Sequence, residues 1–251
     1  MALDAARGAD VLLVGMNKRR SGLFQLLAAV GILLLTAWVT GEGMLRLERI
    51  RAERLLSEVR GLNVDHSQWA EVQPVMRRWA QWGSSKGPCT EQSCNFRINV
   101  EQSLPQFLIG NPAGGSNWLP RLASVIGLRN TAVRAGFTVE QGVVTAKWFG
   151  EQTTLPVGAW SAGNNYIPYL SVLSGESSKF KADAKGHPLH PERSVQRADN
   201  YLLVSYTPDE EAGEKAKLMD FQFECITRVQ PCQSEDAILP EAWRIMQEEK
   251  R

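Results

Sequence analysis

One uninterrupted apolar segment constrains this chain more than any other feature of its sequence. Between Ser21 and Thr40, twenty consecutive residues carry no charged side chain, and Gln25 is the only large polar one. At about 1.5 Å per residue, a helix of this length matches the roughly 30 Å hydrocarbon core of a bilayer. A core helix of a soluble domain is usually shorter or carries a polar face. We therefore predict that residues 21–40 form a transmembrane helix, with the lipid bilayer as its partner.

A basic cluster lies directly before this segment. Lys18, Arg19 and Arg20 would suit a cleaved signal peptide, but the apolar run is long for one and no A-x-A cleavage site follows it. An uncleaved signal anchor agrees better with both features. Residues 1–20 would then be a short cytoplasmic lead, although Met16 followed by a basic run also resembles a natural start of translation.

The two flanks of the segment carry equal numbers of nearby basic residues, so the positive-inside rule orients it only weakly. Those on the N-terminal side adjoin the apolar run directly, whereas residues 41–43 separate it from the first arginine on the other side. We therefore expect the C-terminal part outside the cytoplasm, where disulfides persist. The basic residues are Arg7, Lys18, Arg19 and Arg20 before the segment, and Arg46, Arg49, Arg51 and Arg54 after it.

After the segment, residues 41–64 are expected to form a juxtamembrane amphipathic helix. An apolar residue recurs there at helical spacing, which is typical of a helix with one buried face. The arginines of this stretch would form a solvated face or contact anionic lipid headgroups. Residues 65–251 would then be an extracytoplasmic α+β domain. The apolar stripe consists of Ala52, Leu55, Leu56 and Val59.

Within this domain, helical patterns come first, strands fill the middle and a helix closes the chain. A second helix is expected after Asp65 or Ser67, either of which could be its N-cap. Alternation of apolar and polar residues predicts a strand at Phe96–Val100, and the clearest hairpin surrounds Glu140-Gln141-Gly142. A final helix begins at Pro240. Because no regular βαβ alternation is present, the sheet should be antiparallel. Further strands are expected at Tyr166–Leu173 and Tyr201–Thr207, and a strand or helix at Lys217–Ile226.

Four cysteines form two closely spaced pairs, Cys89 with Cys94 and Cys225 with Cys232. A four-cysteine zinc site normally uses tighter C-x2-C knuckles, and no C-x-x-C redox motif is present. Outside the cytoplasm, two local disulfides are the simplest arrangement. Three connectivities exist for four cysteines, so cross-pairing and metal binding stay open. Each local bridge would fix a turn or a strand entry and stabilise the fold by about 2 kcal/mol.

Three other motifs are weaker candidates for chemistry. GNPAGGSNW, residues 110–118, has glycines at phosphate-loop spacing but Ser116 where that motif needs lysine, so we interpret it as a turn before a helix. His187 and His190 could hold a metal in a loop, but the prolines beside them disfavour a helix that would align them. The acidic run Asp209–Glu214 is interpreted as a solvated turn. We therefore expect no cofactor, no metal site and no catalytic residue.

Three stretches resemble known families. KRRSGLFQLLAAVGILLL, with its extension to about residue 60, resembles the N-terminus of type IV pilin-like proteins, with Gly22 at the leader cleavage position and Leu27 where those proteins carry a glutamate. VDHSQWAEVQPVMRRWAQWG is similar to the helical part of SmpA/OmlA (BamE-like) envelope modules. The stretch from CITRVQPC to LPEAW resembles single-pass bacterial envelope proteins. Together these resemblances imply a bacterial envelope protein.

We therefore expect a single-pass protein of the bacterial inner membrane whose extracytoplasmic domain binds a protein, lipid or cell-wall partner. The net charge of +1 offers no overall basic surface for nucleic acid. Binding agrees better with the sequence than catalysis does. The alternatives are a minor pilin-like subunit cleaved after Gly22, and an envelope hydrolase that gathers His66, His187 or His190 with carboxylates in a pocket.

Overall fold

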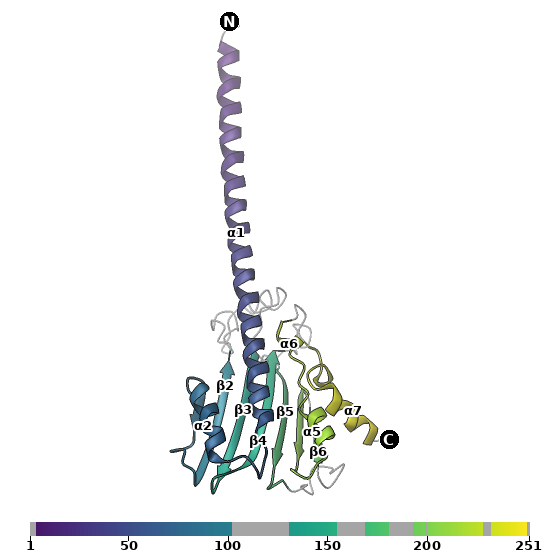
Figure 1. Cartoon of the computed structure of the whole chain (residues 1–251). Coiled ribbons are helices and arrows are strands. Elements are labelled where there is room, and N and C mark those ends of the chain that lie inside the picture. Colours follow the sequence, from purple (N-terminus) through teal and green to yellow (C-terminus); the bar gives the residue numbers. More distant parts are fainter. Residues whose placement is uncertain are drawn as a thin grey trace. The chain divides into compact units, whose positions relative to one another are not determined.

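The computed structural model describes residues 4–101, 131–154, 169–180, 193–198, 200–227 and 232–249. The chain divides into two compact units, Met1–Met44 and Leu45–Arg251. The first unit consists, in its described part, of helix alone, and the second contains the sheet (Figure 1). Each unit is described by itself below.

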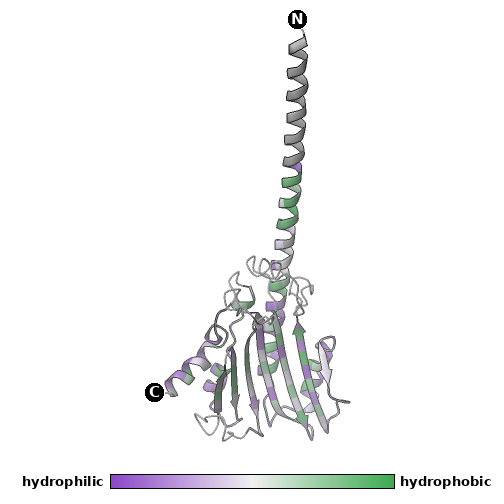
Figure 2. Cartoon of the chain, turned by 180° about the vertical axis from the view of Figure 1, so that it is seen from behind, coloured by the Kyte–Doolittle hydropathy of each residue, from purple (hydrophilic) through white to green (hydrophobic). Residues whose placement is uncertain are grey.

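Helix α1 (Asp4–Gly61) is continuous over 58 residues, so Gly41 and Gly43 do not interrupt it. From Gln25 onward it is long and apolar enough to cross a membrane, by length and composition. Figure 2 colours this part of the helix as hydrophobic. The prediction of a long apolar helix near the N-terminus is confirmed, while its insertion in a bilayer stays a prediction. Its exposed apolar side chains include Leu26, Leu27, Val30, Ile32, Leu33, Leu34, Leu35, Trp38 and Val39.

The last part of α1 belongs to the core of the second unit. The predicted apolar stripe is confirmed, because every one of its four side chains is at most 4% exposed. Leu45 is buried as well. The compact unit therefore begins at Leu45 and not at residue 65, where the sequence placed the domain boundary. The helix expected to lie beside the membrane as a separate element supplies core side chains to the sheet unit.

Helix α2 (Trp69–Arg78) follows, but its cap differs from the prediction. Gln68 is the N-cap residue, and no side chain caps the helix there. Asp65 lies in the left-handed region, with φ of 65°. The Ser67 hydroxyl instead accepts a hydrogen bond from the backbone N–H of Asn63, at 3.0 Å. Both predicted caps are therefore wrong, because the two residues form the turn that joins α1 to α2.

In the described part of the chain, seven strands form one sheet in the order β1-β2-β3-β4-β5-β7-β6. The predicted hairpin is confirmed between β3 and β4, where Gln141 and Gly142 both have positive φ, as a tight two-residue turn requires. The strand predicted at Phe96–Val100 is part of β2. The strands are β1 (Gly83–Ser85), β2 (Ser93–Glu101), β3 (Thr131–Glu140), β4 (Val143–Thr154), β5 (Tyr169–Ser177), β6 (Arg193–Ala198) and β7 (Tyr201–Tyr206).

The sheet is mostly antiparallel, with one exception that the sequence did not predict. Strands β5 and β7 pair in parallel, with Ser171 opposite Tyr201. The exception arises because the chain first forms the edge strand β6 and then returns as β7 between β6 and β5. The last two strands therefore form a hairpin whose second strand, β7, pairs with β5, while its first strand, β6, lies at the edge of the sheet.

Short helices complete the unit after β7. The segment Lys217–Ile226, predicted as strand or helix, contains the end of one helix and the start of another, with irregular chain between them. The final helix begins at Pro240 as predicted. Figure 1 shows α2, α5, α7 and the end of α1 on the same side of the sheet. The elements are α5 (Ala212–Leu218), α6 (Glu224–Thr227), the 3₁₀ helix η2 (Glu235–Ala237) and α7 (Pro240–Glu249).

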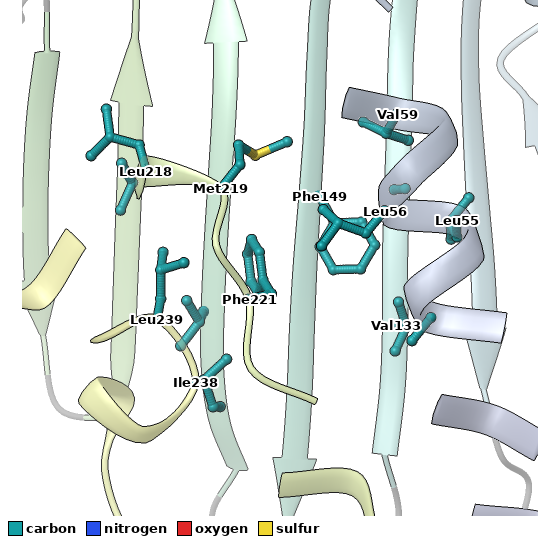
Figure 3. Close-up of a cluster of buried hydrophobic side chains, with 14 of the residues drawn as sticks. Leu55, Leu56, Val59, Val133, Phe149, Leu218, Met219, Phe221, Ile238 and Leu239 are labelled. Carbon is teal, nitrogen blue, oxygen red and sulfur yellow. The ribbon is translucent and has the colours of Figure 1, made fainter. Parts of the chain in front are cut away.

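The core lies between this layer and the sheet (Figure 3). Phe149 of β4 is fully buried, and its ring meets Phe221 edge-on at 4.8 Å between centroids and Phe223 at 5.8 Å. Leu55 and Val59 of α1 are buried in the same cluster. The segment after α5 therefore packs against the centre of the sheet beside α1.

A buried carboxyl group joins α1 to the start of β3. Glu48 is 3% exposed, and the Thr131 hydroxyl donates a hydrogen bond to its Oε1 at 2.6 Å. Burial raises the pKa of Glu48 to about 7, against the lowering effects of the Thr131 hydrogen bond and the Arg51 charge. Between pH 4.5 and 7 the folded chain therefore binds a proton that the unfolded chain releases.

This linkage predicts that the free energy of unfolding falls as pH rises through that interval, by up to about 3 kcal/mol for this one group. Glu48→Gln removes the ionisation and keeps the hydrogen-bond acceptor. We expect the stability advantage of the variant over the native chain to grow between pH 4 and pH 8 in urea titrations of the full chain in detergent. Parallel pH profiles for the two proteins would show that Glu48 titrates normally.

Candidate functional site

Both expected local cysteine pairs lie at disulfide distance. The Cα atoms are 4.4 Å apart in Cys89–Cys94 and 5.3 Å apart in Cys225–Cys232. Cys94 is the second residue of β2, so the first bridge holds the entry to that strand. Cys225 lies in α6, so the second bridge closes a loop after that helix. Among the described residues, no group of three or more histidine, cysteine or acidic side chains could hold a metal ion.

Of the other motifs singled out in the sequence, most lie outside the described residues. The glycine-rich stretch 110–118, His187 and His190 lie outside the described residues. His66 is exposed in the turn after α1 and lines neither of the hollows described below. The geometry therefore offers no histidine-based site within the part of the chain that is described.

The acidic run after β7 is exposed at Asp209 and Glu211, as expected of a solvated turn, but not at Glu210. Glu210 is 6% exposed, and Arg193 of β6 forms an ion pair with it at 3.2 Å. Arg193 also reaches Glu214 of α5 at 3.5 Å. The expectation was wrong for Glu210 because a cation from a neighbouring strand compensates its buried charge, and a local sequence pattern does not reveal such a partner.

A concave site lies between the end of α1 and helix α5. It is a hollow of about 490 Å³, which is within the usual size range of small-ligand sites. We call it the Arg60 pocket. Its lining includes Arg60, Lys147, Glu176, Tyr206, Lys215 and Asp220.

A buried ammonium group forms the base of the Arg60 pocket. The side chain of Lys147 on β4 is 7% exposed and forms an ion pair with Glu176 of β5 at 3.2 Å. Its Nζ also donates hydrogen bonds to the backbone carbonyls of Arg60, at 3.4 Å, and Leu62. These carbonyls lie at the C-terminal end of α1, where helices leave acceptors unpaired and favour positive charge. Lys147 therefore caps α1 from the sheet.

Glu176 is compensated from two sides. Lys215 of α5 reaches its other oxygen, Oε1, at 3.0 Å and donates a second hydrogen bond to the Pro208 carbonyl at 2.6 Å. Tyr206, 1% exposed, lies close enough to Glu176 that the carboxylate charge adds to burial in raising the pKa of its phenol. Burial lowers the pKa of Lys147, and the Glu176 charge opposes this effect. The pocket base is thus a network in which Lys147 and Lys215 both pair with Glu176.

The rim of the pocket carries charged groups with unused hydrogen-bonding capacity. Arg60 donates from Nη2 to the Met219 carbonyl at 2.5 Å and pairs with Asp220 at 3.3 Å. A guanidinium group has five N–H donors, so several remain for a ligand. Lys217 pairs with Glu214 at 2.6 Å. The side chains of Arg60 and Lys217 are 40% and 42% exposed, so both remain accessible.

A second hollow of about 340 Å³ adjoins the first. It lies between α1 and the segment Asp220–Glu224, and the two hollows share Arg60 and Asp220. Its lining also includes Arg49, Ser57 and Gln222. The Arg60–Asp220 ion pair therefore stands where the two hollows meet, and Arg60 is accessible from both.

These residues were not singled out from the sequence, although one signal was present. The strand VVTAKWF alternates, and Lys147 occupies the same face as the fully buried Phe149. A charge at an inward position of a confidently expected hairpin indicates a buried partner. The partner itself, Glu176, is a non-local neighbour that periodicity does not identify.

Comparison with protein-family models, with curated proteins and with solved structures found no match for this chain.

The lysine–glutamate network predicts a strongly coupled pair of substitutions. Lys147→Met should lower the free energy of unfolding by about 3–5 kcal/mol, because it leaves Glu176 less compensated and the end of α1 uncapped. Glu176→Gln should cost a similar amount by leaving Lys147 unpaired. The double variant should lose clearly less than the two single losses together. Chemical denaturation of the four proteins measures this coupling, and additive losses would contradict the direct pairing.

Proposed function

We propose that this chain is a single-pass protein of the bacterial inner membrane whose second unit lies outside the cytoplasm and binds a partner in the Arg60 pocket. The observation that carries the proposal is the pocket itself: a concave site with a compensated, rigid base and a rim of accessible donors. Rigid placement of polar groups lowers the cost of ordering them on binding. Such a site suits the recognition of a partner.

Two further features support the location. One helix is long and apolar enough to serve as the anchor, and its apolar side chains are exposed in the structure. Two local disulfides agree with an oxidising compartment, since disulfides are rare where thiols are kept reduced. Orientation with the second unit outside the cytoplasm reconciles the anchor with the disulfides.

The pocket favours binding over catalysis. The three hydrogen-bond donors of the Lys147 ammonium group are matched by two carbonyls and Glu176, so all of them are engaged by protein partners and none is left for a substrate. Glu176 lies between two ammonium groups, and each of its oxygens is engaged by one of them. Both buried groups therefore position the pocket.

Thiol labelling in cells tests the proposal. The native cysteines should resist a membrane-impermeant maleimide until spheroplasts are treated with an impermeant phosphine reductant, and should then react without lysis. An added cysteine, Ala9→Cys, serves as the control and should react only after lysis, because it would lie in the cytoplasm. Native cysteines that react as free thiols before reduction, or only after lysis, would refute the proposed location.

A second candidate, a pilin-like structural subunit, is favoured by one observation. The apolar segment and its amphipathic extension are a single helix, and the resemblance to type IV pilin-like N-termini depends on that combination. Processing by a prepilin peptidase would remove the chain up to Gly22 and leave Leu23 as the new N-terminus. The intact mass of the chain purified from membranes decides the matter, and an uncleaved N-terminus would exclude this subunit.

A further inference from the structure

We infer that the Arg60 pocket takes the carboxylate of an acidic peptide segment, which extends from there into the adjoining hollow along α1. This inference rests on the proposed function, that the second unit binds a partner, and specifies the chemistry of that partner. Three features support this ligand: the donors at the rim, the walls of the two hollows and the Arg60–Asp220 pair.

The charges of the lining favour an anion. Four cationic side chains line the Arg60 pocket against the two carboxylates of Glu176 and Asp220. Glu214 pairs with Lys217 and Asp220 pairs with Arg60, so the positive excess lies where Lys147 and Lys215 share the single carboxylate of Glu176. Charge-assisted hydrogen bonds from such groups to a carboxylate are stronger than neutral ones. The cationic side chains of the lining are those of Arg60, Lys147, Lys215 and Lys217.

The Arg60–Asp220 pair marks the place of the incoming carboxylate. Asp220 is 45% exposed and accepts hydrogen bonds from Arg60 and from Gln222, at 3.3 and 3.1 Å. An exposed pair of this kind contributes little to stability, so its replacement by a ligand carboxylate costs little. Arg60 keeps its bond to the Met219 carbonyl during this exchange and stays in place. Asp220 therefore acts as a competitor that the ligand displaces.

The walls favour a peptide over a small inorganic anion. Ala212, Ala216 and Met219 add apolar surface beside the charged rim of the Arg60 pocket. Phosphate has no apolar part that would use this surface, whereas an acidic residue with its neighbours does. The adjoining hollow offers Ser57 and Gln222, whose side chains can bond to a peptide backbone. Glu53 and Glu224 line it as well, so the acidic side chain of the peptide belongs in the Arg60 pocket and the adjoining hollow takes uncharged residues. Two connected hollows with a shared arginine suit an extended chain with one carboxylate at the junction.

Selection from a random heptapeptide library tests the inference. The full chain in nanodiscs is the bait, and empty nanodiscs remove membrane binders. Selected peptides are synthesised with a fluorescent label, and their Kd values are measured by anisotropy for the native chain and its variants. We expect the selected peptides to contain Asp or Glu, to lose binding when that residue is replaced by its amide, and to bind more weakly as salt rises.

The variants separate recognition from folding. Arg60→Gln and Lys215→Gln should each raise the Kd by about tenfold or more, as expected for the loss of a charge-assisted hydrogen bond. Asp220→Asn should lower the Kd several-fold, because it removes the competing carboxylate. Lys179→Gln is the matched control and should change nothing, since Lys179 is exposed and pairs with Glu140 away from the pocket. A damaged fold cannot explain tighter binding by Asp220→Asn.

Several results would overturn the inference. Selection of no peptides or of neutral ones, unchanged binding in Arg60→Gln, or weaker binding in Asp220→Asn would each contradict it. Equal displacement of the peptide by millimolar inorganic phosphate would assign the pocket to a small anion. None of these outcomes bears on the thiol-labelling result, so the inference can fail while the proposed location and anchoring stand.

Discussion

The arrangement of the elements around the Arg60 pocket depends on the interactions of the Lys147 ammonium group. A buried charge is tolerated only where its partners are close and well oriented. Lys147 finds them in two elements, the end of α1 and the Glu176 carboxylate on β5, and the same carboxylate also holds Lys215 of α5. The compensation of one charge therefore sets the positions of the two helices that form the walls of the Arg60 pocket.

This arrangement divides the charged groups by role. At the base, Lys147 and Glu176 are nearly inaccessible and satisfy one another, so these two groups contribute geometry. The groups at the rim, Arg60 and Lys217, are about two-fifths exposed and are only partly engaged. A buried network is costly to rearrange, whereas an exposed ion pair exchanges partners readily. This contrast predicts that a ligand replaces an ion-pair partner at the rim while the buried network keeps its arrangement.

How far the sequence predicts this molecule depends on the range of each interaction. The stripe of α1, the β3–β4 hairpin and the final helix follow from periodicity or turn chemistry within one segment, and the structure confirms them. The parallel β5–β7 pair depends on where a strand inserts, and the burial of Glu210 depends on Arg193 from another strand. Lys147 occupies an inward position of β4 that the sequence analysis did not single out, and its partner Glu176 was decided by tertiary packing. Local patterns therefore predict the elements, and the site arises from contacts between them.

The Cys225–Cys232 disulfide lies next to one wall of the adjoining hollow. Cys225 follows Glu224 directly, and Glu224 ends the segment that forms one wall of the adjoining hollow. That segment is irregular between α5 and α6, and its backbone N–H groups at Phe221 and Gln222 donate to the carbonyls of Met219 and Ile238. The bridge to Cys232 closes a short loop directly after it and limits its conformations. Phe221 and Phe223 hold the same segment against Phe149 from the core side. The wall that carries Asp220 is thus fixed by packing on one side and by the Cys225–Cys232 bridge at its end, which makes the shape of the site depend on that bridge.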